Sequence, residues 1–205
     1  MKKLHLISAF LLALPSLAIS TPPPQKTVTP AEQATPSYIK EAPLPKGWPQ
    51  PGPYNEVSEK SFPAYRAAYT AMNSENFAFW RLFRHIKRNN IPMTSPVEME
   101  VEEDGEKLRM KSMAFLYQST DVGQTGEDGK KVDVKDSPTL KTLSYTWQGG
   151  KSSANLKKAK NALDTELEKR KLKSDDYRVM GYNSPSVPNA QKTWEMIVIL
   201  PTAKQ

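Results

Sequence analysis

The pattern of hydrophobic and polar positions is clearest over residues 76–99, where a helical period gives way to a strand period. Four apolar residues recur at spacings of three and four, which places them on one face of a helix: Phe79, Leu82, Phe83 and Ile86. Ser74 suits the N-cap, and Asn89 before Pro92 suits the end. The spacing predicts a core-facing surface helix over 75–89.

After this helix, the sequence changes to the two-residue alternation of a β-strand. Val97, Met99 and Val101 alternate with three glutamates, so the segment 94–103 is predicted to be a strand with one buried face. The glutamate row 98, 100 and 102 is interpreted as a solvent-facing side rather than a cation site. Similar alternation predicts strands over 55–59, 64–71, 107–118, 141–148, 177–182 and 193–200. Asp104-Gly105 suits a two-residue hairpin turn.

A second helix is predicted after Gly149-Gly150, with Ser153 as its cap. Its inner stripe consists of Leu156, Ala159, Leu163 and Leu167. The polar, aperiodic segment 121–138 is interpreted as one long loop. The elements then read β-α-β-β twice, over 64–118 and 141–200. This predicts an α+β fold in which both halves contribute to one antiparallel sheet and both helices cover it.

The first 20 residues combine Lys2 and Lys3, an apolar run over 4–14 and small residues at the end, as a secretory signal peptide does. We therefore expect a secreted or periplasmic protein; an uncleaved N-terminal tether is the alternative. No second apolar run is long enough to span a membrane. The chain has no Cys, which excludes lipidation at a lipobox and any disulfide.

Residues 21–53 contain ten of the 18 prolines and are interpreted as a Pro-rich linker, although a Pro-rich recognition segment has the same composition. The last part of this segment, near Trp48, is where packing onto the domain is expected. The domain itself is expected over 54–205, and one core suffices for its length.

Charge and residue types narrow the function. The net charge is +7, and it falls to +5 without Lys2 and Lys3. The lysines gather mainly on the second predicted helix, without the interleaved aromatics of a nucleic-acid surface, so no nucleic-acid partner is expected. After the leader, His85 is the only histidine, which excludes paired-His zinc sites and Cys-His catalysis. We therefore expect a non-enzymatic protein.

Two segments carry a family resemblance. The helix ending FRHIKRNN that runs into IPMTSPVEM resembles the diagnostic segment of the SOUL family of haem-binding proteins, and GYNSPSVPNAQKTWEMIVIL at 181–200 resembles its C-terminal element. The similarity extends from about Tyr54 to Leu200. It implies a distorted barrel-like sheet with two helices, related to the effector-binding domains of some bacterial transcription regulators. It also implies haem or a related tetrapyrrole as the ligand.

The candidate ligand-binding residues follow from these two segments. A groove beside Phe79, Trp80 and Phe83 offers apolar surface for a macrocycle, and Arg84 and Lys87 at its edge offer cations for propionates. Further candidates, from the motif segments, are Met93, Tyr182 and Asn183.

The axial ligand of a bound iron is a separate question. His85 is the candidate metal ligand, since imidazole commonly ligates haem iron. At the edge of the apolar face it is equally well interpreted as a flanking polar residue. Methionine thioethers are the alternative, at Met93, Met99, Met110, Met113, Met180 or Met196.

Three functional hypotheses remain open. The first is non-enzymatic haem or tetrapyrrole binding, for buffering or transport outside the cytoplasm. The second is a binding module of the same fold for another hydrophobic small molecule. The third is hydrolysis of a small molecule in the groove between the two halves, as some proteins of related fold perform.

Overall fold

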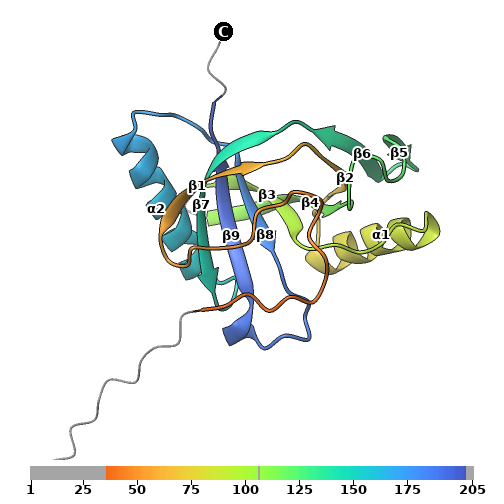
Figure 1. The fold of residues 1–205 in the computed structure, drawn as a ribbon, viewed down its shortest axis with the longest axis horizontal. Helices are drawn as coiled ribbons and strands as arrows, with labels where there is room; N and C mark the ends of the chain where they lie inside the picture. Colours follow the sequence, from red (N-terminus) through yellow and green to blue (C-terminus); the bar gives the residue numbers. More distant parts are fainter. Residues whose placement is uncertain (1–35, 106, 202–205) are drawn as a thin grey trace, which may run out of the picture. The chain divides into compact units, whose positions relative to one another are not determined.

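A computed structural model of the chain describes residues 36–105 and 107–201. The expected signal peptide and the first part of the Pro-rich segment lie outside these residues. The elements in chain order are β1 (Val57–Phe62), β2 (Tyr65–Ala71), α1 (Glu75–Arg88), β3 (Val97–Asp104), β4 (Lys107–Leu116), β5 (Gly126–Asp128), β6 (Val132–Ser137), β7 (Leu140–Gln148), α2 (Ser153–Lys169), β8 (Tyr177–Gly181), a 3-10 turn η1 (Asn189–Gln191) and β9 (Thr193–Ile199) (Figure 1).

The nine strands form one antiparallel sheet in the order β1-β7-β9-β8-β3-β4-β2-β6-β5. Its centre has an internal symmetry, because β7-β9-β8 mirrors β2-β4-β3 and the two halves meet where β8 pairs with β3. Each half follows the order β-α-β-β, with α1 in the first and α2 in the second. The predicted repeat and the predicted α+β class are therefore confirmed.

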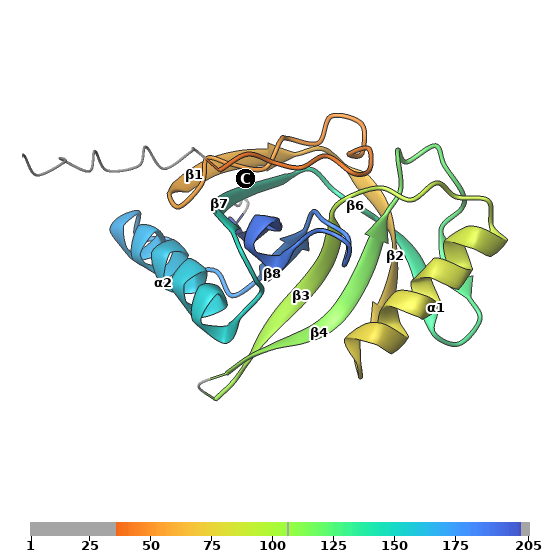
Figure 2. The same ribbon diagram turned by 90° about the horizontal axis from the view of Figure 1, so that it is seen from below.

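The sheet curls strongly. β1 and β2 lie six places apart in the sheet, yet only Pro63-Ala64 joins them, and Pro138-Thr139 alone joins β6 to β7. Such short links are possible only if the two ends of the sheet approach each other, and Figure 2 shows this curvature. The sheet consequently has an enclosed inner face and an outer face, as in a distorted barrel.

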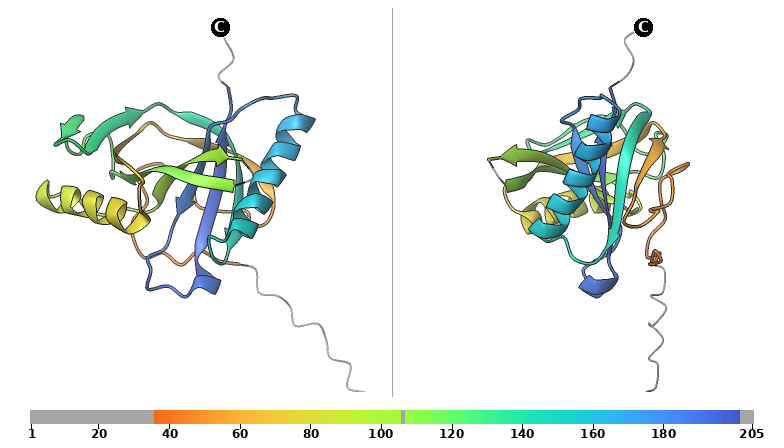
Figure 3. Two further views of the ribbon diagram at one scale, coloured as in Figure 1. Left: turned by 180° about the vertical axis from the view of Figure 1, so that it is seen from behind. Right: turned by 90° about the vertical axis from the view of Figure 1, so that its left-hand side faces the viewer.

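Two hydrophobic clusters occupy the two faces. The outer cluster joins α1 and α2 to the sheet through residues such as Leu82, Leu163 and Val179. The inner cluster contains Phe62, Tyr65 and Ile197. Figure 3 shows the two helices at opposite ends of the sheet. The apolar stripes predicted from sequence lie against the outer face, where Leu82, Ile86, Leu156 and the rest of the α2 stripe are buried.

The two helix starts differ from prediction in detail. Ser74 occupies the N-cap position of α1, but its side chain makes no capping hydrogen bond. The cap of α2 is Ser152 rather than Ser153, since the Ser152 hydroxyl accepts a hydrogen bond from Asn155 N at 3.2 Å. Two consecutive serines satisfy the same sequence rule, so sequence alone does not choose between them.

The long loop predicted over 121–138 is wrong in its second half. Residues 126–128 and 132–137 form the hairpin β5–β6, and β6 pairs with β2. The segment is short and polar, with only Val132 and Val134 buried. Its strand conformation depends largely on backbone pairing with β2, and two alternating valines are too short a pattern to predict a strand.

Residues 36–53 lie against the domain as an extended strap. Trp48 is 6% exposed, and its ring packs 4.6 Å from that of Phe62 and 5.2 Å from that of Tyr65. Backbone hydrogen bonds fix the strap further, from Lys46 N to Gln118 O and from Ser95 N to Pro43 O. Within residues 36–105 and 107–201, no helix is long and apolar enough to cross a membrane.

Candidate functional site

An apolar groove of about 510 Å³ lies between the first half of α1 and the loop that follows β8. We call it the α1 groove. The helix forms one wall, outer-face residues of the sheet form the floor, and residues 183–192 with strap residues 41–42 form the opposite wall. The groove therefore joins the two sequence segments that are more than 80 residues apart in the chain and that sequence analysis singles out.

Three aromatic side chains of α1 form the helical wall. Phe79 stacks on Phe83 with ring centroids 6.1 Å apart, and Trp80 meets both rings edge-on at 5.8 and 5.5 Å. Their spacing of one, three and four residues keeps them together on adjacent parts of the helix surface. Trp80 is 57% exposed, so this wall continues onto the molecular surface.

The floor consists of sulfur-containing and aromatic side chains. Met99 from β3, Met113 from β4 and Trp194 from β9 all line the groove. Gly181 of β8 pairs with Trp194, and a Cβ atom on residue 181 would lie only 2.8 Å from Trp194 Cζ3. Glycine at this position therefore allows the indole ring to lie against β8.

Two lysines supply positive charge to the groove, Lys151 and Lys192. Lys151 Nζ lies 5.6 Å from the centre of a Trp194 ring, 3.7 Å from Met99 Sδ and 2.9 Å from Glu75 Oε2. Its side chain is only 15% exposed, so the charge is held close to the apolar floor. Arg84 does not line the groove, and Lys87 lines a smaller neighbouring hollow with Phe83 and Met93.

Polar bonds fix the opposite wall. The Glu41 carboxylate accepts bonds from Ser184 N and Ser184 Oγ, both at 2.8 Å, and from Asn183 Nδ2 at 3.3 Å. Asn183 also donates to Ile39 O at 2.7 Å and accepts from Thr193 N at 2.8 Å. The bonds from Ser184 lower the pKa of Glu41 below its usual range. Glu41 and Asn183 thus tie the strap to the loop and shape this wall.

Tyr182 borders the groove, but its hydroxyl is used elsewhere. It donates to Glu195 Oε2 at 2.6 Å on the inner face, and burial raises its pKa well above the usual range. Glu195 is fully buried and also pairs with Lys60 Nζ at 2.5 Å. The phenol is therefore a fixed neutral part of the core rather than an available ligand.

His85 lies on the other side of α1, outside the groove. It is 4% exposed; its Nδ1 donates to Asp128, and its Nε2 lies 2.7 Å from the Tyr117 hydroxyl. His85 and Arg88 together lower the pKa of Asp128 to about 2. The interpretation of His85 as a flanking polar residue underestimates its burial, because the β5–β6 hairpin that supplies Asp128 is not predicted from sequence.

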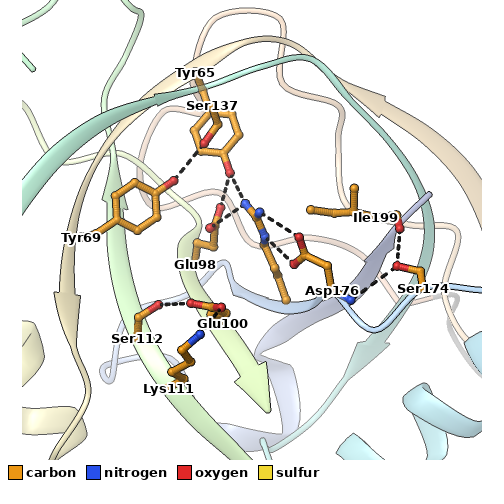
Figure 4. A network of polar contacts seen from close by, with 11 residues as sticks. Tyr65, Tyr69, Glu98, Glu100, Lys111, Ser112, Ser137, Ser174, Asp176 and Ile199 are labelled. Carbon is orange, nitrogen blue, oxygen red and sulfur yellow. Dashed lines mark hydrogen bonds and ion pairs between the residues drawn. The ribbon is translucent and has the colours of Figure 1, made fainter. Parts of the chain in front are cut away.

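A second polar cluster occupies the inner face, as Figure 4 shows. Glu98 is 2% exposed and accepts bonds from Tyr65 OH at 2.7 Å and from Arg178 Nη1 at 3.1 Å. Burial raises the pKa of Glu98, and Arg178 offsets part of this effect. The solvent-facing interpretation is therefore wrong for Glu98, because the curled sheet encloses this face.

Six of the eight predicted ligand-binding residues line the α1 groove: Phe79, Trp80, Phe83, Met93, Tyr182 and Asn183. Arg84, Lys87 and the predicted metal ligand His85 do not. Sequence reasoning missed Lys151, Lys192 and Trp194, of which the last two lie inside the second motif segment. It offered Met99 and Met113 only as members of a longer set of methionines. Among the described residues, no group of three or more acidic, His or Cys side chains is arranged to hold a metal ion.

Comparison with known proteins adds a family and a fold. The model of the family described as SOUL heme-binding protein matches residues 53–199. No curated protein matches the sequence significantly.

Among solved structures, EcmrR in a complex with DNA has a TM-score of 0.54 at 10% identity, covering 72% of this chain and 58% of that chain. This chain thus spans little more than half of EcmrR. The EcmrR C-terminal domain has a TM-score of 0.53 at 12% identity, and the match covers 72% of this chain and 98% of that domain. A hydrolase from Listeria innocua has a TM-score of 0.54 at 11% identity, and the match covers 73% of this chain and 94% of that chain. These similarities concern the fold alone, which is like that of the EcmrR C-terminal domain and of the Listeria innocua protein.

Proposed function

Since the chain belongs to the SOUL heme-binding protein family, we propose that it binds haem or a related tetrapyrrole in the α1 groove without catalysing a reaction. The observation that carries this proposal is the meeting of the two family-like segments in one apolar groove with cations at its side. A flat macrocycle with two carboxylates needs this combination of aromatic surface and positive charge.

The groove residues fit a tetrapyrrole in three respects. Phe79, Phe83 and Trp194 offer ring faces for stacking on the macrocycle. Lys151 and Lys192 are the cations that would pair with propionates, in place of the predicted Arg84 and Lys87. When bound, haem would supply an iron centre that accepts a soft or nitrogen ligand.

Thioethers are the iron ligands that the groove itself offers, from Met93, Met99 and Met113. Met93 is half-buried, whereas Met99 and Met113 are each 2% exposed and belong to the floor. Met93 is therefore the most accessible thioether. His85 lies outside the groove, and one of its ring nitrogens would have to leave its partner, Tyr117 at Nε2 or Asp128 at Nδ1, before it could ligate iron.

The proposed role is to buffer or carry the ligand outside the cytoplasm. The support for this location is the signal-like composition of residues 1–20. A site built for reversible binding agrees with a groove that is open along Trp80, since a carrier must both accept and release its ligand.

The experiment is a haemin titration of the chain from residue 21 onward, followed by visible absorbance. We expect a saturable Soret shift at one haemin per chain in the parent and in Lys157→Ala, an exposed lysine of α2. Met93→Leu keeps the volume of the side chain and removes the sulfur, so it should change the band position with little loss of affinity. Absence of any saturable shift in the parent would refute haem as the ligand.

One observation supports a second candidate, a different hydrophobic molecule bound without iron ligation. Two of the three thioethers of the groove belong to its packed floor, and no His lines it. Binding of metal-free protoporphyrin with the same affinity as haemin would favour this candidate, because an iron–ligand bond contributes only when iron is present.

A further inference from the structure

Three large hydrophobic side chains are markedly exposed among the described residues: Ile39, Phe77 and Trp80. Single exposed hydrophobic residues are ordinary on protein surfaces. These three are notable because each lies in or beside a segment that forms the α1 groove. Trp80 lines it, Phe77 follows the lining residue Asn76, and the Ile39 carbonyl accepts a bond from the lining residue Asn183.

Phe77 and Trp80 lie on the exposed side of α1, away from its buried residues such as Leu82. Figure 2 shows this helix at one end of the sheet. At 100° per residue, an arc of about 100° around the helix axis contains two aromatic and three basic residues: Phe77, Trp80, Arg84, Lys87 and Arg88. Phe77 is 73% exposed and Trp80 57% exposed. The opposite side of the helix packs on β2, β4 and β6. The outward face thus combines exposed aromatic rings with cations on one rigid helix.

The aromatic and basic residues are segregated along this face. Phe77 and Trp80 lie in the first half of α1, beside the groove, and Arg84, Lys87 and Arg88 follow in the second half. Arg88 pairs with Asp128, whereas Arg84 and Lys87 make no ion pair within residues 36–105 and 107–201. Lys87 Nζ lies 5.8 Å from the centre of the Phe83 ring. Two cations without an acidic partner, next to exposed aromatic rings, complement a surface that has negative headgroups over an apolar interior.

We propose that this face of α1 docks onto the surface of an anionic lipid bilayer, with Phe77 and Trp80 inserted at the headgroup level and Arg84 and Lys87 on lipid phosphates. Trp is favoured at membrane interfaces because its ring is apolar and its N–H is polar. Aromatic residues beside Lys and Arg on one helix face are typical of helices that lie in the interface. Each cation near an anionic membrane strengthens attachment by about fivefold.

Docking in this orientation would place the mouth of the α1 groove against the bilayer, since Trp80 belongs to both the docking face and the groove wall. An apolar ligand could then pass between membrane and groove without crossing water. This second step depends on the proposed function, whereas docking itself does not.

The test is sedimentation of the protein, from residue 21 onward, with vesicles of phosphatidylcholine containing 30% phosphatidylglycerol, and with vesicles of phosphatidylcholine alone. We expect binding to the anionic vesicles that falls at least tenfold in Phe77→Ser and in the double variant Arg84→Glu/Lys87→Glu. The matched control Lys157→Glu/Lys158→Glu changes two exposed lysines of α2 by the same charge and should retain most of the binding. Equal loss in the control would overturn the proposal, because attachment would then depend on net charge alone.

Fluorescence reports the depth of insertion directly, since Trp48 and Trp147 are buried, Trp194 is half-buried and Trp80 is the exposed tryptophan. Anionic vesicles should shift the emission to the blue in the parent but not in Trp80→Phe. Unchanged vesicle binding in Phe77→Ser would overturn the proposal. So would a dimer in solution that Phe77→Ser dissociates, because a second copy of the chain would then cover this face.

Haemin titration without vesicles separates this inference from the proposed function. Phe77 does not line the groove, so Phe77→Ser should bind haemin as the parent does while losing vesicle binding. A parent that binds vesicles but no haemin would support docking and refute the haem function. A parent that binds haemin but no vesicles would refute docking and support the haem function.

Discussion

Gly181 and Trp194 are directly paired across β8 and β9, and the glycine has no room for a Cβ atom because it would meet the indole ring at 2.8 Å. The pair forms part of the floor of the α1 groove. The shape of the groove therefore depends on the absence of a single methyl group.

Gly181→Ala should displace the Trp194 ring into the groove and weaken haemin binding by about tenfold, with a stability loss of about 1–3 kcal/mol from overpacking. Haemin titration and urea unfolding measure the two effects. Gly150→Ala is the control, because nothing lies within 4 Å of a Cβ there, its backbone is not left-handed and residue 150 does not line the groove. Unchanged haemin affinity in Gly181→Ala would show that Trp194 does not contribute to binding.

Arg178→Met should leave the buried Glu98 carboxylate without its cation and cost about 3–5 kcal/mol at pH 7. The loss should depend on pH. Below about pH 4, Glu98 is protonated in both the folded and unfolded states, so the deficit is small. As the pH rises, the folded parent, in which Arg178 offsets part of the effect of burial, releases the Glu98 proton before folded Arg178→Met does, so the deficit grows.

Urea unfolding of parent and Arg178→Met at several pH values between 4 and 8 checks this prediction. Asp176→Asn removes the more exposed partner of Arg178 and should cost less than about 1 kcal/mol. A deficit that is constant over this range would mean that Arg178 does not affect the protonation of Glu98 in the folded protein.

His85→Ala should destabilise the protein by about 1–3 kcal/mol, because it leaves the buried Tyr117 hydroxyl without a partner and removes one of the donors to Asp128, which keeps Arg88 and Asn89. The haemin Soret shift should persist, since His85 lies outside the groove. Visible titration and thermal unfolding give the two readouts, with the exposed Lys130→Ala in the β5–β6 turn as the control. Loss of the shift in a folded variant would identify His85 as the iron ligand.

The strap should be essential for stability. Trp48→Ala removes a buried ring that packs on Phe62 and Tyr65, at a cost of about 3–5 kcal/mol. For the same reason, a chain that starts at residue 54 should unfold at a much lower temperature than one that starts at residue 36. Calorimetry measures both, with Lys40→Ala, an exposed strap residue, as the control. Equal stability of the two truncated chains would show that residues 36–53 are a linker in energetic terms as well as in composition.

The regular part of the fold could be predicted from the sequence because each main element has one buried face. The α1 stripe includes Leu82 and Ile86, and in β3 the apolar residues Val97, Met99 and Val101 alternate with polar ones. Both patterns arise because these residues pack in the outer cluster. The β5–β6 hairpin shows only a short alternation, Val132 and Val134, which is too brief to identify a strand in a polar segment; backbone pairing with β2 supplies the rest of its order.

Curvature explains the remaining differences. The alternation in β3 predicts one apolar face and one solvent-facing face, but the curled sheet encloses Glu98 next to Tyr65. In the site, the aromatic residues of α1 could be found because they exceed what one core-facing stripe needs. Met99 and Met113 could not be separated from core methionines such as Met196, because floor and core lie on the same strand faces.

The most direct test of the central claim is to locate the ligand by NMR, with amide shifts followed during titration with the diamagnetic haem analogue gallium protoporphyrin. Binding in the α1 groove predicts saturable shifts in residues 76–83, 97–99, 181–184 and 194. The inner face around Phe62 and Tyr65, and the exposed side of α2, should remain unperturbed. Shifts that gather on the inner face, or no saturable shifts at all, would contradict the assignment of the α1 groove as the tetrapyrrole site.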